Sequence, residues 1–199
     1  MTKAMFRRGS VSVLLVITGL VTGTLVESTQ APSCAAAALS PAMAQSAPNI
    51  SVNGYVSTDK VQRGRMAQAA VVMEIPGGFH INSNRPLEKF LVATQLTVEA
   101  PQGVKVGAVT FPRALMKTFQ FSKDKLSVYE GRVILRFSAV VPANFSGGSM
   151  QLKAKLRYQS CSDSLCFPPQ TREIKLDVPV VAMNESVKRV NTQYFGGKR

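Results

Sequence analysis

From residue 50 onward, hydrophobic and polar residues alternate with a period of two, the pattern of a β-strand that buries one face. Apolar residues alternate with Lys and Arg over residues 152–158, and the alternation returns over residues 173–178. Further strand-like runs cover residues 51–56, 66–75, 93–99, 104–110 and 133–141. Gly and Pro lie between these runs, and no segment has the pattern of a convincing amphipathic helix. The sequence therefore predicts an all-β domain.

The number and spacing of the predicted strands narrow the fold class. Seven or eight short strands with frequent turns favour an immunoglobulin-like antiparallel β-sandwich, with a β-barrel as the alternative. We expect this domain to occupy residues 45–183. The remaining residues, 184–199, are polar and basic and predict a poorly ordered tail.

The N-terminal 44 residues have the three parts of an export signal. A positive start with three basic residues precedes an apolar, uncharged stretch over residues 11–26, and Ala42-Met43-Ala44 provides a small-residue cleavage site. We expect cleavage there and export beyond the cytoplasm. The long interval between the apolar stretch and the cleavage site leaves one alternative, an uncleaved anchor at the outer face of the inner membrane. Contact with the membrane is expected only in that case.

Composition and charge exclude several classes of function. The 199-residue chain has 24 Lys and Arg against 11 Asp and Glu, a formal charge of +13. The basic residues are scattered over the alternating runs, so we interpret them as solvent-exposed strand faces and expect no nucleic-acid partner. His80 is the only histidine, which excludes a histidine-rich metal site. We expect neither a metal nor an organic cofactor.

Two cysteines are the clearest chemical feature of the chain. Cys161 and Cys166 lie on the connection between two predicted strands, which brings their backbones within the distance that a disulfide needs. The loop that such a bond closes is small, so the bond removes little entropy from the unfolded chain. Their spacing leaves three interpretations open: a structural disulfide, a redox-active pair and a metal-binding pair.

The residues around the cysteines resemble a known family. The pattern Tyr158-Gln159-x-Cys161-x-Asp163-x-x-Cys166-x-Pro168-Pro169 is similar to the active-site hairpin of the N-terminal domain of the thiol:disulfide interchange protein DsbD family. The similarity extends to Gly78-Phe79-His80-Ile81-Asn82-Ser83-Asn84 with Pro86, and to Tyr129-Glu130-Gly131. It therefore covers nearly the whole of the predicted domain.

This resemblance implies a thiol–disulfide oxidoreductase of the periplasm whose cysteine pair passes electrons to or from thioredoxin-like proteins. By position, Cys166 forms the mixed disulfide with a partner and Cys161 resolves it. A phenylalanine on a cap loop shields the pair in the family, and either Phe119 or Phe121 takes that place here. The chain stops at Arg199 without the membrane domain of full-length members. We therefore expect a separate membrane protein as electron donor, and a monomeric domain.

Two further residues are candidates for tuning the cysteines. His80 either packs at a strand end or lies near the pair and favours a thiolate. Asp163, between the cysteines, either shapes the turn or disfavours a thiolate.

The alternative to a redox domain is an exported β-sandwich that acts as a binding or adaptor module and holds an inert disulfide.

Overall fold

The computed structural model describes residues 46–196 of the chain. The predicted export signal, residues 1–44, lies outside the described residues, as do residues 197–199. Residues 46–196 form twelve strands and one four-residue helix. None of the helical structure in this range is long and apolar enough to cross a membrane.

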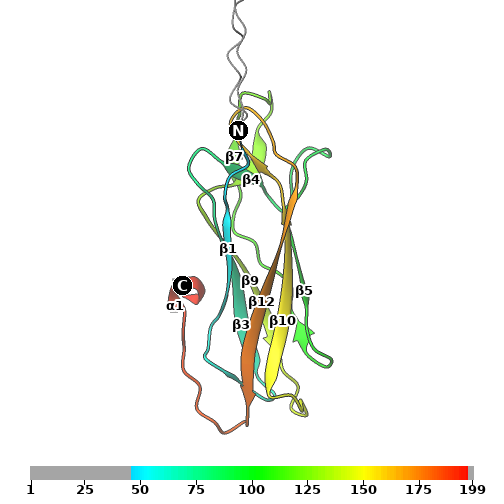
Figure 1. Cartoon of the computed structure of the whole chain (residues 1–199), viewed down its shortest axis with the longest axis vertical. Helices are drawn as coiled ribbons and strands as arrows, with labels where there is room; N and C mark the ends of the chain where they lie inside the picture. The colour runs from blue at the N-terminus through cyan, green and yellow to red at the C-terminus, as the bar shows by residue number, and fades with distance from the viewer. Residues whose placement is uncertain (1–45, 197–199) are drawn as a thin grey trace, which may run out of the picture. The chain divides into compact units, whose positions relative to one another are not determined.

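Two four-stranded sheets face each other in a sandwich (Figure 1). Their strand orders are β1-β3-β9-β6 and β2-β12-β10-β5. All neighbouring strands are antiparallel except β2 and β12, which run parallel over two residues. The strands of the first sheet are β1 (Ser51–Val56), β3 (Met66–Glu74), β9 (Arg132–Val140) and β6 (Lys105–Val106), and those of the second are β2 (Val61–Gln62), β12 (Gln170–Val181), β10 (Ser149–Tyr158) and β5 (Gln95–Glu99).

The alternation in the sequence places one face of each long strand in the core. In β10 every second residue is buried, and β9 follows the same pattern. Leu135 of β9 and Leu156 of β10 are fully buried within one hydrophobic cluster that both sheets share. Each fully buried side chain of this size contributes about 1.5–3 kcal/mol through removal of apolar surface from water. The predicted immunoglobulin-like antiparallel β-sandwich is confirmed.

A third, smaller sheet lies beyond one end of the long strands, at the top of Figure 1. Its strands are antiparallel, in the order β11-β4-β8-β7. They are β11 (Ser160–Cys161), β4 (His80–Asn82), β8 (Leu126–Tyr129) and β7 (Leu115–Lys117). The sequence did not predict this sheet, because its strands have only two to four residues and β8 is buried on both faces. Such segments show no alternation.

The C-terminal segment packs against β1. The ring of Tyr194, in α1 (Thr192–Phe195), has its centroid 4.2 Å from that of Tyr55. Asn191 Nδ2 donates a hydrogen bond to the carbonyl of Val56 at 2.9 Å, and Arg136 Nε donates one to the carbonyl of Tyr194 at 2.6 Å. Part of the predicted tail, residues 191–194, therefore lies against the sandwich through these contacts. Contacts of single aromatic and amide side chains hold them, and composition does not reveal such contacts.

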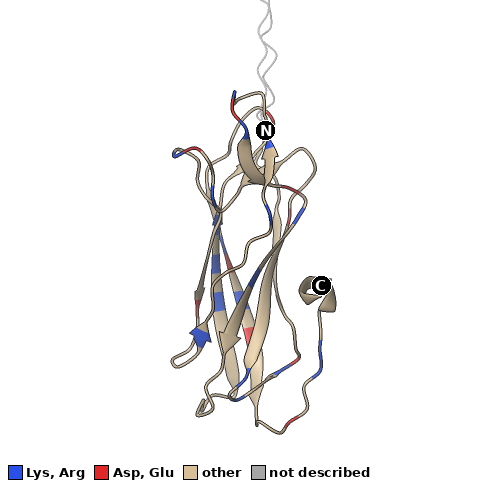
Figure 2. Ribbon diagram, turned by 180° about the vertical axis from the view of Figure 1, so that it is seen from behind, with Lys and Arg blue, Asp and Glu red and all other residues tan. Residues whose placement is uncertain are grey.

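Basic residues occupy exposed positions on the strands, most clearly along β10. Figure 2 shows Lys and Arg on strands as well as on loops. Along β10, Lys153, Lys155 and Arg157 occupy the exposed positions of the alternation. Exposed ion pairs, such as Arg132 with Glu74, contribute at most about 1 kcal/mol each. The fold is therefore held mainly by its core.

Gly54 of β1 marks a point where the two sheets approach closely. A Cβ atom on Gly54 would lie 2.6 Å from side-chain atoms of both Ile174 and Leu176 on β12. We predict that Gly54→Ala lowers the free energy of unfolding by about 1–3 kcal/mol, the usual cost of overpacking a core. Urea denaturation measures this change. Gly148→Ala is the control, because a Cβ there meets nothing within 4 Å. Equal losses of stability in the two variants would contradict close packing at Gly54.

Candidate functional site

The cysteine pair closes a hairpin between β11 and β12. Cys161 and Cys166 form a disulfide with their Cα atoms 3.9 Å apart, and their backbones pair as an isolated antiparallel bridge. Between them, the N–H of Ser162 donates a hydrogen bond to the carbonyl of Leu165 at 2.8 Å. The disulfide therefore sits on a tight turn next to the small sheet.

The two cysteine residues differ in their exposure. Cys161 belongs to β11 and is 0% exposed, whereas Cys166 lies on the returning side of the turn and is partly exposed. Leu165, directly before Cys166, is also exposed. A thiolate approaching from solvent therefore meets Cys166 before the fully buried Cys161.

The side-chain amide of Gln159 ties the hairpin to its surroundings. Its Oε1 accepts hydrogen bonds from Asn82 Nδ2 at 3.1 Å and from the backbone N–H of Val92 at 3.2 Å. Its Nε2 donates to the carbonyl of Phe167 at 3.1 Å. These bonds join β4, the loop before β5 and the residue after Cys166. The sequence pattern indicates no particular role for Gln159 or Asn82. The only sequence signal for these two residues is that both lie inside the motifs that carry the family resemblance.

Strand β4 places His80 directly opposite Cys161. The two residues are partners in the antiparallel register of β4 and β11, so their side chains lie on the same face of the small sheet. His80 is 1% exposed. Burial lowers the pKa of His80 from its ordinary value, and the nearby carboxylates of Glu130 and Asp163 partly oppose that shift. The imidazole is therefore neutral at pH 7.

Phe119 covers His80. The two rings are stacked with their centroids 3.9 Å apart, and Phe119 is 8% exposed. Phe121 stacks on Phe119 at 5.6 Å and is 37% exposed. Phe119 also belongs to a small hydrophobic cluster with Leu91, Leu126 and Val128. The loop between β7 and β8 thus contributes an inner ring, Phe119, and an outer ring, Phe121.

Asp163 lies exposed on the turn between the cysteines and borders a surface hollow of about 340 Å³. His80 also lines this hollow, as does the ion pair of Lys117 Nζ with Glu130 Oε2 at 2.5 Å. The small sheet and its loops therefore bring together all the residues that the sequence singled out: Cys161, Cys166, Phe119, Phe121, His80 and Asp163.

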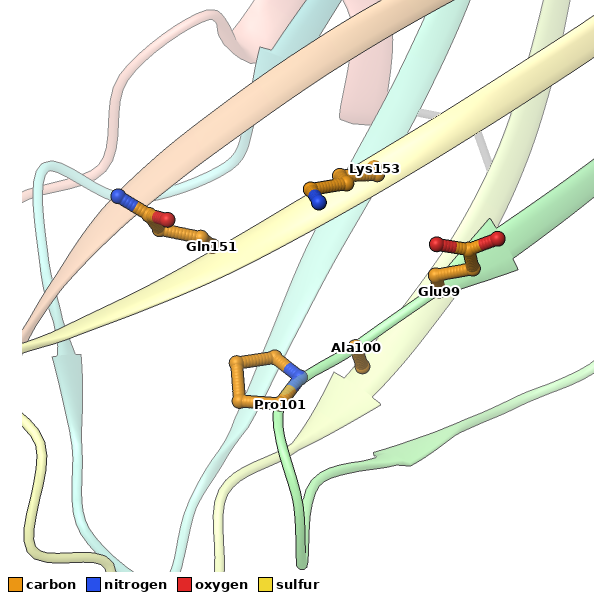
Figure 3. A pocket seen from close by; sticks show the side chains of 5 residues that line it. All are labelled: Glu99, Ala100, Pro101, Gln151 and Lys153. Carbon is orange, nitrogen blue, oxygen red and sulfur yellow. The ribbon is translucent and has the colours of Figure 1, made fainter.

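Another hollow, of about 240 Å³, lies over β5 and β10 (Figure 3). Its lining consists of Glu99, Ala100, Pro101, Gln151 and Lys153. It offers one carboxylate and one amine but no nucleophilic sulfur, so the cysteine hairpin is the stronger candidate site. Within residues 46–196, no group of three or more His, Cys, Asp or Glu side chains is placed to hold a metal ion.

The geometry around the hairpin fits thiol–disulfide exchange. This chemistry needs a sulfur that an incoming thiolate can reach and a second sulfur that leaves as a thiolate. The partly exposed Cys166 and the buried Cys161 supply these two sulfurs. On the buried side, His80 lies opposite Cys161 in the register and stacks against Phe119.

The chain matches one family model and is similar to several solved structures. The family model described as "Thiol:disulfide interchange protein DsbD, N-terminal" matches residues 54–178. The chain is similar to the DsbD N-terminal domain of Neisseria meningitidis in its reduced form, with 17% identity, a TM-score of 0.39, and coverage of 69% of this chain and 88% of that one. It is also similar to the N-terminal periplasmic domain of ScsB from Proteus mirabilis, with 13% identity, a TM-score of 0.44, and coverage of 65% and 46%.

No curated protein matches the chain. The family model, however, covers well over half of its length and includes both cysteines of the hairpin. The chain therefore belongs to the family of the N-terminal domain of the thiol:disulfide interchange protein DsbD.

Proposed function

We propose that residues 45–183 form a periplasmic thiol–disulfide oxidoreductase domain. It passes electrons between a membrane-bound donor and thioredoxin-like proteins through Cys161 and Cys166, without a cofactor. In this proposal residues 1–44 direct export. The observation that carries the proposal is the unequal exposure of the two cysteine residues in a chain of this family.

The unequal exposure supports a different role for each cysteine. A partner thiolate attacks the Cys166 sulfur, the bond to Cys161 breaks, and a mixed disulfide forms between the partner and Cys166. Cys161 receives the electron pair of the broken bond. In the opposite direction, Cys161 attacks Cys166 and releases the partner as a thiolate. Because Cys161 is buried, it reacts only with the sulfur beside it.

We assign the cap to the loop between β7 and β8, with Phe119 as its inner residue. Phe119 contacts the ring that lies opposite Cys161, whereas Phe121 contacts His80 only at a centroid distance of 6.3 Å. A partner has to displace this loop to reach the hairpin from the side of His80. The loop therefore slows reaction with unspecific thiols.

The alternative function is that of a binding or adaptor module whose disulfide is structural and inert. The complete burial of Cys161 favours this alternative. The reduction potential of the purified domain distinguishes a redox-active disulfide from an inert one. We predict a potential above about −300 mV, because structural disulfides of exported proteins lie below that value. Equilibration with glutathione or dithiothreitol buffers measures it. A potential well below −300 mV would support the inert disulfide.

Single cysteine variants test the two roles. We predict that Cys161→Ser accumulates a covalent adduct with a thioredoxin-like protein, because the thiol that resolves the mixed disulfide is missing. Cys166→Ser should form no adduct, because its remaining thiol is buried. Non-reducing electrophoresis and mass spectrometry detect the adduct. Equal adduct formation by both variants, or by neither, would contradict the assignment.

Truncation of the cap tests the role of Phe119. Loss of its stack on His80 removes about 1 kcal/mol from the closed loop, so Phe119→Ala should speed reduction of the disulfide by dithiothreitol roughly fivefold. Phe121→Ala is the matched control and should have a smaller effect, because its ring is more exposed and farther from His80. The rate of thiol appearance measures both. Unchanged rates in the two single variants and in the double variant would exclude a shielding role.

A further inference from the structure

His80 carries a buried polar atom without a partner. Among the described residues, its Nε2 is one of the buried side-chain nitrogen and oxygen atoms that have no hydrogen bond. A buried polar atom without a partner destabilises the folded protein relative to a paired one. An apolar ring would fill the same place under Phe119 without this cost. The retained nitrogen therefore suggests a state of the protein in which it has a partner.

The register of the small sheet identifies that partner. His80 and Cys161 face each other across β4 and β11, and Cβ atoms of such pairs lie about 4.5–5.5 Å apart. Both side chains are almost completely buried. In the disulfide, the Cys161 sulfur has no proton and no charge to offer. Once the bond opens, the same sulfur becomes a thiol that donates or a thiolate that accepts.

We propose that His80 is the proton acceptor and donor of the buried thiol Cys161. This inference rests on the proposed exchange function. When Cys161 attacks, its thiol proton passes to Nε2, its sulfur forms the bond to Cys166, and the partner leaves as a thiolate. When a partner thiolate opens the disulfide, the electron pair goes to the Cys161 sulfur. The neutral imidazole takes up a proton from the solvent and passes it to this sulfur.

The surroundings of His80 suit this proton exchange. In the oxidised protein, burial keeps the imidazole neutral, so that it is able to accept a proton. Three charged groups act on it: Glu130 after β8, Asp163 on the cysteine turn, and Lys117 at the end of β7. The two carboxylates favour the protonated ring and the lysine disfavours it. Burial also penalises the Cys161 thiolate, so this sulfur depends on a local proton acceptor.

A two-step reaction with an aromatic disulfide isolates the step at Cys161. The reduced mature domain reacts with dithiobis(nitrobenzoate), and Cys166 releases a first coloured thiolate. Attack by Cys161 on the resulting mixed disulfide releases a second one. Stopped-flow absorbance over a range of pH gives the rate of each phase. The second phase occurs within the domain, so it does not depend on entry of the reagent.

His80→Phe keeps a ring that can stack on Phe119 but removes both nitrogens. We expect the second phase to slow at least about tenfold at pH 7, the effect of losing one charge-assisted hydrogen bond. The pH at which this phase reaches half its maximum should rise by about one unit. His80→Gln should show the same rise, because an amide does not take up a proton. It also provides the test if His80→Phe does not fold.

The reaction separates a failure of this inference from a failure of the proposed function. Tyr129→Phe is the control, because it removes a hydroxyl of the same small sheet that bonds to Asn84 and should leave the second phase unchanged. An unchanged rate and pH profile in both His80 variants would overturn the role of His80 while exchange stands. A wild-type protein without a second phase would overturn the exchange function itself.

Discussion

The pairing of β11 with β4 is the constraint on which the candidate site depends. It spans only two residue pairs, Ser160 with Ile81 and Cys161 with His80. This short ladder buries one sulfur of the disulfide against the neighbouring strand and leaves the other on the turn. Two pairs are too few to hold a strand in water without support. The amide of Gln159 provides part of that support through three hydrogen bonds to the surrounding backbone and side chains.

The domain consists of a large sandwich and a small sheet. This division suits a protein that has to expose its disulfide to a partner and cover it again. The sandwich has long strands, a shared core and residues such as Leu135 and Leu156 that are fully buried. The site instead lies on strands of two to four residues and on the loop that carries Phe119. Apart from Phe119, residues 118–125 of this loop are exposed or half-buried. Segments with little buried surface open at a lower free energy than the core. The loop is therefore able to move while the sandwich stays folded.

Burial acts on the site in two opposite ways. It protects Cys161 from unspecific thiols, and it also disfavours the thiolate that exchange requires. A buried imidazole next to this sulfur allows both protection and reactivity, because it accepts and donates a proton inside the protein. The stacked rings of Phe119 and Phe121 add a covering layer that contains no polar atoms. Shielding and reactivity thus come from different side chains of one small sheet and its loop.

The sequence by itself determined the sandwich, the cysteine hairpin and the family. Alternation along residues 152–158 and 173–178 is a local consequence of burying one strand face, so it is visible in one dimension. Only the tertiary structure decided which sulfur is buried, which ring lies over His80, and that Gln159 ties the hairpin in place. The segments involved, β4, β8 and β11, are too short or too completely buried to show a period. Their pairing joins residues about 80 positions apart, such as His80 and Cys161. No local pattern encodes a contact over that separation.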